Sequence, residues 1–278
     1  MQETRIGDIE ILSYFRFEAH RGVTNVVTTR AGGRSTGAYG SLNLGLHVGD
    51  EPDTVLENRA LLAQALALEP ESFTLAEQVH KTKVAVVKAP HAGRGAVTED
   101  DALARTDAMI TRIPDVPLMV LVADCVALSF YDPQRDAVGL AHAGWRGTLA
   151  HIADVTVRRM ERAFDTDPEN LIVGVSPAIG REHYTVGEDV FSAFRDEFGG
   201  GGAEEFIHQG SDGTFSIDLP GINTWELREC GILPENIEAS GLCTACHPER
   251  FYSHRGSGGT TGRFANIVML HSTARRQY

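Results

Sequence analysis

Short apolar runs bounded by glycine, proline or aspartate recur along the chain and predict β-strands. The predicted strands are 23–29, 83–88, 117–123, 126–131, 137–142 and 171–176. Longer segments between them place apolar residues on one face of a helix, and the predicted helices are 54–67, 148–164 and 186–198. Because helices and strands interleave and two of the strands form a hairpin, the pattern predicts an α/β protein with a mixed sheet.

The hairpin brings a cysteine and a histidine together. An Asp-Pro pair favours a type I turn, which predicts a four-residue loop at 132–135 and pairs Tyr131 with Asp136. Counting outward from that pair sets Cys125 opposite His142, and directly opposed residues have Cβ atoms about 5 Å apart. A lone cysteine in an apolar strand is usually a small buried hydrophobic residue. With the histidine opposite, the pair indicates half of a zinc site or a nucleophile with its base.

A third candidate ligand ends the Gln-Val-His motif at 78–80. His80 lies just before the strand predicted at 83–88, where side chains can converge on a site. Together with Cys125 and His142 it forms a Cys-His-His set. Three protein ligands leave one position open, which is typical of catalytic zinc and not of structural zinc.

Three glycine-rich segments are candidate binding loops. HAGWRG at 142–147 precedes a predicted helix and presents Arg146 where an anion such as phosphate can bind. The alternative is a tight strand-to-helix turn without a binding role, which would have the same sequence pattern. The segment 28–45 is too long for a turn and lacks the GK[ST] ending of a triphosphate loop, which leaves a binding loop or an ordinary surface loop. The third segment is GSGGTTGR at 256–263, where Arg255 just before it and Arg263 at its end can reach a substrate.

CTACH at 243–247 matches the Cys-x-x-Cys-His pattern of c-type haem attachment. That chemistry accompanies export, and because charged residues are spread among 1–15 we expect no secretory signal there. A redox dithiol would require a thioredoxin-like βαβ pattern around it. We therefore expect Cys243 and Cys246 to be incidental loop thiols, dispensable for metal content.

Composition narrows the class of protein. The chain has 278 residues, of which 42% are hydrophobic and 23% charged, and we expect one globular domain spanning 1–278. A net charge of -13 disfavours nucleic acid and anionic membranes as partners, so a small-molecule substrate is expected. The apolar run at 117–123 is too short to span a bilayer. Four cysteines are too few for a disulfide scaffold, and we expect a cytoplasmic protein with free thiols.

Taken in order, the motifs resemble the laccase-domain, or multicopper polyphenol oxidoreductase, family, whose members are assigned as zinc-dependent purine nucleoside phosphorylases. The matching segments are 28–59, QVH at 78–80, DAMIT at 107–111, ADC at 123–125, HAGWRG at 142–147, SPAIG with Tyr184 and Val186 at 176–186, Asp218-Leu219, Cys243-Thr244, and FYSHR with TGR at 251–263. Three positions depart from the family pattern: Lys81 replaces a glycine, Ala127 a proline and Gly256 an arginine. These departures spare the metal ligands and bear on substrate preference.

The resemblance implies a single-domain α-β-β-α sandwich with mixed sheets and a metal held by His80, Cys125 and His142. It also implies phosphorolysis of adenosine, inosine or S-methyl-5'-thioadenosine, with adenosine deamination as a side activity. We expect the substrate-binding residues to include Arg30, Asn43, Arg59 and Arg146. The three arginines are the expected phosphate clamp, since a guanidinium holds an oxyanion bidentately.

Two other enzymatic interpretations stay open. A Cys-His hydrolase, amidase-like, would use Cys125 as nucleophile and His142 as base. A copper-dependent polyphenol oxidase would match the older family name, but multicopper sites use clustered His-x-His pairs, and the sequence contains none. Zinc is therefore the expected cofactor and copper the less favoured one.

Overall fold

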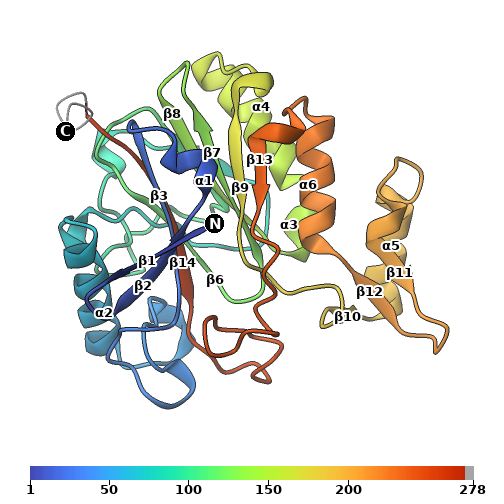
Figure 1. Ribbon diagram of the computed structural model, residues 1–278, viewed down its shortest axis with the longest axis horizontal. Coiled ribbons are helices and arrows are strands. Elements are labelled where there is room, and N and C mark those ends of the chain that lie inside the picture. The colour runs from blue at the N-terminus through green and yellow to red at the C-terminus, as the bar shows by residue number, and fades with distance from the viewer. Residues whose placement is uncertain (273–278) are drawn as a thin grey trace.

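The computed structural model describes residues 1–272, in which two large β-sheets pack face to face (Figure 1). The first sheet is antiparallel throughout and has the order β1 (Gln2–Ile6), β2 (Ile9–Ser13), β3 (Val23–Thr28), β14 (Phe264–Leu270), β6 (Leu118–Val122). The second sheet has the order β13 (Ile237–Ala239), β9 (Ile172–Val175), β7 (Val126–Asp132), β8 (Ala137–Ala143), β5 (Ala108–Thr111), β4 (Val84–Val86). It is mixed, because its outermost pairs, β13 with β9 and β4 with β5, are parallel.

The helices are α1 (Phe15–Glu18), α2 (Pro52–Ala65), α3 (Trp145–Leu149), α4 (Ile152–Phe164), α5 (Glu188–Phe198) and α6 (Leu219–Glu229). α2 covers the outer face of the first sheet, and α4 and α6 cover that of the second. Short 3₁₀ helices occupy Gly37–Tyr39, Leu46–Val48, Pro70–Ser72, Ala89–His91, Pro168–Asn170, Glu204–Phe206 and Pro234–Asn236. A small third sheet, β10 (Thr185–Val186), β12 (Phe215–Ile217), β11 (Ile207–Gln209), projects with α5 at the side of the molecule (Figure 1).

Buried side chains fill three layers, one for each interface of the sandwich. Leu62 of α2 packs with Ile267 of the first sheet, and Val120 and Leu140 belong to the core between the sheets. The third layer joins the second sheet to α4, α5 and α6. Since β7 and β8 are covered on both faces, they are apolar at nearly every position, as the sequence pattern indicated. The predicted α/β sandwich is confirmed.

All six predicted strands are present, and the helices predicted at 54–67 and 186–198 correspond to α2 and α5. The structure adds elements that the pattern did not predict, namely β1, β2, β5, β10, β11, β12, β13, β14, α1 and α6. β1 is polar or charged at four of its five positions, because it is the exposed edge strand of the first sheet. Such a segment lacks the continuous apolar run that marks a buried strand.

The predicted hairpin register is wrong by two residues. Asp132 pairs with Ala137, so the loop is 133–136 and Ala127, not Cys125, lies opposite His142. Asp132 stays in the strand because its carboxylate accepts the backbone N–H groups of Gln134 and Arg135 within the turn, at 2.9 and 3.1 Å. Side chains alternate with a period of two, so a two-residue shift preserves the face, and Cys125 and His142 remain neighbours on a diagonal.

The helix predicted at 148–164 is interrupted at His151. This residue has left-handed backbone angles, φ 60° and ψ 44°, which end α3 and let α4 start in a new direction. Its imidazole bonds Glu226 of α6 at 2.7 Å and Glu197 of α5 at 2.9 Å. These hydrogen bonds raise the pKa of His151 to about 9, with burial acting in the opposite direction.

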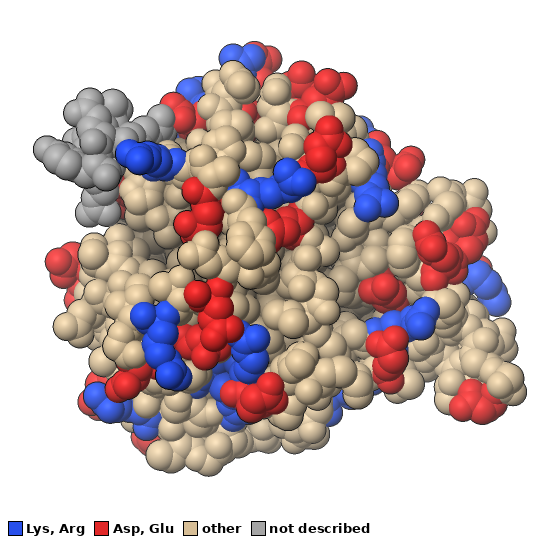
Figure 2. Space-filling model, viewed as in Figure 1, with Lys and Arg blue, Asp and Glu red and all other residues tan. Residues whose placement is uncertain are grey.

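Within residues 1–272, no helix is both long and apolar enough to cross a membrane. On the face drawn in Figure 2, acidic and basic side chains are interspersed, and the described residues form no continuous basic area there.

The His151 contacts predict a pH-dependent contribution to stability. The folded pKa of about 9 lies above the usual 6.5, so the stabilisation is complete below about pH 6.5 and is lost as pH rises through about 9. His151→Asn tolerates the left-handed backbone but cannot titrate. We expect the wild-type advantage in free energy of unfolding to shrink by roughly 1 kcal/mol between about pH 6 and pH 10, allowing for solvent screening. Urea unfolding of both proteins measures it; an unchanged difference contradicts the assignment.

Candidate metal centre and active site

The three predicted ligands converge in the folded chain. The ligand atoms of His80, Cys125 and His142 all lie within 4.8 Å of one another. His80 lies in the turn before β4, Cys125 immediately precedes β7, and His142 is near the end of β8. The two imidazole rings meet edge to face, with centroids 4.7 Å apart.

The Asp107 carboxylate fixes both histidines. Its Oδ1 lies 3.0 Å from Nδ1 of His142, which leaves Nε2 of that ring for the ligand side. Its two oxygens also accept the backbone N–H groups of Val79, His80 and Lys81, with the shortest contacts at 2.8 Å. A buried carboxylate behind a metal-ligating histidine orients the ring and raises its basicity. The sequence analysis gave no role to Asp107.

Two backbone features shape the space between the ligands. Asp124 has φ 88°, a left-handed conformation, and its carboxylate accepts a 2.6 Å hydrogen bond from Thr244 and another from the backbone of Arg255. Gly144 has no side chain, and a Cβ there would lie 2.8 Å from the His80 ring and 3.0 Å from the Cys125 sulfur. Both features keep Cys125 open to the histidines.

The electrostatics of the set favour a thiolate. Burial alone would raise the pKa of Cys125, but the positive charge of His142 and hydrogen bonds from both histidines lower it to about 6. Burial opposes charging of His142 as well, but the Cys125 charge and the Asp107 hydrogen bond raise its pKa to about 9. A thiolate is the form of cysteine that binds metals or attacks electrophiles.

The ligand set opens on a cavity of about 430 Å³. Arg146, Arg255 and Arg263 line it, together with Tyr184. The Arg146 guanidinium stacks on Trp145 at 4.2 Å, and that of Arg255 lies 5.2 Å from the centre of the Tyr184 ring. The cavity therefore combines a soft metal-ligand set, cationic groups and flat aromatic faces.

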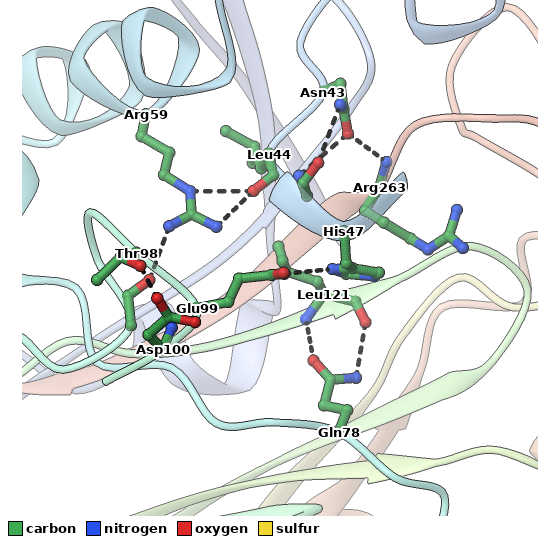
Figure 3. Close-up of polar contacts among 12 residues, drawn as sticks. Asn43, Leu44, His47, Arg59, Gln78, Thr98, Glu99, Asp100, Leu121 and Arg263 are labelled. Carbon is green, nitrogen blue, oxygen red and sulfur yellow. Dashed lines mark hydrogen bonds and ion pairs between the residues drawn. The ribbon is translucent and has the colours of Figure 1, made fainter. Parts of the chain in front are cut away.

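Three of the predicted substrate-binding residues have other partners (Figure 3 shows two of them). The fully buried Arg59 donates to the backbone carbonyls of Leu44, Gly95 and Ala96, and burial lowers its pKa to about 10. Arg30 donates to the carbonyls of Gly40 and Pro248 and stacks on Tyr252. Asn43 accepts the backbone N–H of Arg263 at 2.9 Å. These residues do not line the cavity at the ligand set, whereas Arg146 does.

Other residues of the cavity had no role in the sequence analysis. His47 lies 3.0 Å from Glu99, and Gln78 makes a pair of hydrogen bonds with the backbone of Leu121 that tie the His80 turn to β6 (Figure 3). His254 also lines the cavity. The positions of Gln78 and Asp107 inside matched motifs were the available signal for both.

A family model described as multi-copper polyphenol oxidoreductase laccase matches residues 24–271. The chain belongs to this family. The sequence resemblance is thereby confirmed.

Relatives of the family have been named for an activity. The purine nucleoside phosphorylase of Bacteroides thetaiotaomicron is 32% identical over 95% of this chain and 97% of its own length. The purine nucleoside phosphorylase YlmD of Geobacillus stearothermophilus is 37% identical over 89% of this chain and 90% of its own length. The crystal structure of YlmD from that organism gives a TM-score of 0.91 at 34% identity, covering 98% of both chains. The crystal structure of the hypothetical protein YfiH from Bacillus licheniformis gives a TM-score of 0.89 at 33% identity, covering 96% of this chain and 98% of that chain.

The close approach at Gly144 predicts that Gly144→Ala lowers metal affinity by at least tenfold, because the new methyl group enters the space between His80 and Cys125. Gly147→Ala is the matched control, since its Cβ would lie no closer than 3.4 Å to any neighbour. Metal titration of both purified variants measures the affinity. Equal binding by the two proteins would contradict the site.

Proposed function

We propose that this protein is a purine nucleoside phosphorylase with zinc held by His80, Cys125 and His142. The observation that supports the proposal most directly is the cavity, where a three-ligand set opens beside three arginines. The names of the relatives support the same activity. The substrates we propose are adenosine, inosine and S-methyl-5'-thioadenosine, each cleaved with phosphate.

The donor set of His80, Cys125 and His142 suits a single zinc ion better than a multicopper centre. One thiolate and two imidazoles are common zinc ligands, and a carboxylate behind His142 is the usual outer partner of such a site. A multicopper centre requires several clustered histidines. Zinc bound here would supply Lewis acidity, including activation of water, which the proposed adenosine deaminase side activity requires.

The remaining groups of the cavity suit phosphorolysis. In this reaction a phosphate oxygen bonds to the anomeric carbon as the bond from that carbon to the purine nitrogen breaks, giving ribose 1-phosphate and the free base. The Arg146 guanidinium can hold the phosphate dianion. Arg255 and Arg263 each donate through one nitrogen to backbone carbonyls, and their other guanidinium nitrogens can add to the positive charge of the cavity. Tyr184 and Trp145 offer faces against which a purine can stack.

One observation favours a second candidate, a cysteine hydrolase. A cysteine hydrolase arranges a nucleophile, a base and an orienting carboxylate in a row, and Cys125, His142 and Asp107 have this arrangement. The pKa of Cys125 is also lowered to about 6. Such an enzyme would act without metal and form a covalent intermediate on Cys125. Covalent trapping at Cys125 in the metal-free protein would identify such a hydrolase, and its absence would leave the phosphorylase as the favoured function.

We expect cleavage of adenosine to require phosphate. Pure protein is incubated with adenosine in the presence and absence of phosphate, and the sugar product is identified by mass spectrometry. Ribose 1-phosphate, formed only with phosphate, is the expected result. Free ribose at equal rates under both conditions would identify a hydrolase and remove the phosphate role of the arginines.

Arg146→Ala should raise the KM for phosphate about ten- to a hundredfold, since one charge-assisted contact contributes about 1.5 to 3 kcal/mol. The zinc content should not change. Arg158→Ala is the control, because Arg158 is exposed on α4 and pairs with Asp154 at 2.7 Å. A KM for phosphate that is the same in both variants would mean that Arg146 does not hold phosphate.

A further inference from the structure

A second set of soft ligand atoms lies outside the cavity described above. The thiols of Cys243 and Cys246 lie 3.7 and 3.6 Å from Nδ1 of His183, and all three ligand atoms are within 4.8 Å of one another. The two cysteines are those of CTACH, which the sequence analysis took as incidental thiols. The sequence gave no reason to join them to a histidine sixty residues away.

The fold brings these residues together through the end of β9. The chain after β9 makes a bridge between Ala178 and Cys243, and the next turn carries His183 back over the two thiols. The backbone N–H of Gly180 donates to the Cys243 sulfur at 3.1 Å. A Cβ on Gly180 would lie 3.2 Å from that sulfur and 3.3 Å from a carboxylate oxygen of Glu182.

We propose that His183, Cys243 and Cys246 form a second metal site, which binds a thiophilic divalent cation of the zinc class. The two cysteines have the Cys-x-x-Cys spacing of zinc sites, and an imidazole completes three soft donors. Glu182 lies on the same turn as His183, but its carboxylate is not part of the cluster of three ligand atoms. A disulfide involves the two sulfurs alone. The His183 nitrogen lies almost equally far from both sulfurs, which favours a shared metal ion over a disulfide.

The position of this second site gives it a structural role. Thr244, between the two cysteines, donates to the Asp124 carboxylate at 2.6 Å, and Asp124 directly precedes Cys125. His183 directly precedes Tyr184, which lines the cavity. A metal that ties the turn at 180–184 to the loop at 243–247 would therefore brace one wall of the active-site cavity. This inference does not depend on the reaction that occurs there.

The test measures zinc per chain in the full-length protein, purified under reducing conditions, loaded with zinc and desalted. We expect Cys246→Ser and His183→Asn each to bind one equivalent less than the wild type. Cys230→Ser is the matched control, because Cys230 is a partly buried thiol beside Asp154 and should leave zinc unchanged. If Cys246→Ser keeps the wild-type zinc content, the second site does not exist, whatever the first site holds.

Cobalt substitution isolates the second site from the first. In Cys125→Ser, which lacks the thiol of the first site, bound cobalt should still give an intense sulfur-to-cobalt charge-transfer band. The band should disappear in Cys125→Ser/Cys246→Ser. Absence of the band in Cys125→Ser overturns the proposal. A disulfide between Cys243 and Cys246 would also overturn the proposal. It would show after zinc loading as an intact mass lower by two hydrogens, with neither thiol reacting with an alkylating reagent.

Discussion

The Asp107 carboxylate is the constraint on which the active site depends. It joins the turn that carries His80, the start of β5 and the end of β8, three segments that are distant in sequence. Burial alone would raise the pKa of Asp107, but hydrogen bonds from His142 and from the backbone of Lys81 and His80 keep it below its usual value. The carboxylate therefore stays charged where it is buried, and a charged acceptor holds its donors more tightly than a neutral one.

The sandwich supplies the rigid frame for this arrangement. Side chains alternate along β7 and β8, so Cys125 points to the same face as Ala127, and His142 to the same face as Leu140. That face packs against the other large sheet, and both ligands therefore lie at the margin of the core between the sheets. The left-handed backbones of His80 (φ 58°) and Asp124 (φ 88°) lie next to or within the ligand set. Residues other than glycine adopt this conformation at a cost of about 1 to 3 kcal/mol, which the surrounding hydrogen bonds must offset. The strain is local, and the neighbouring strands are regular.

The hydrophobic pattern predicted a mixed α/β fold and the central strands, because long apolar runs buried on both faces are a strong signal, whereas the sandwich was implied by the family resemblance. The wrong hairpin register still placed Cys125 and His142 on one face, since parity survives a shift of two residues. No periodicity connects His80 with that hairpin, and its assignment came from the family motif. Nor can a sequence show whether a guanidinium faces a pocket or folds back onto carbonyl oxygens, which is why Arg30 and Arg59 were grouped with Arg146.

The two sulfur-containing sets illustrate how surroundings decide what similar ligands do. The first set is backed by a buried carboxylate, opens on a cavity lined by arginines, and holds a cysteine whose pKa is lowered to about 6. The second has two thiols, lies near the surface and connects two loops by their backbones. A metal in the first set would face the arginine-lined cavity, whereas a metal in the second would join two loops near the surface. The same soft donors therefore suit catalysis in one place and cross-linking in the other, because only the first set is backed by a buried carboxylate and faces a cavity lined by three arginines.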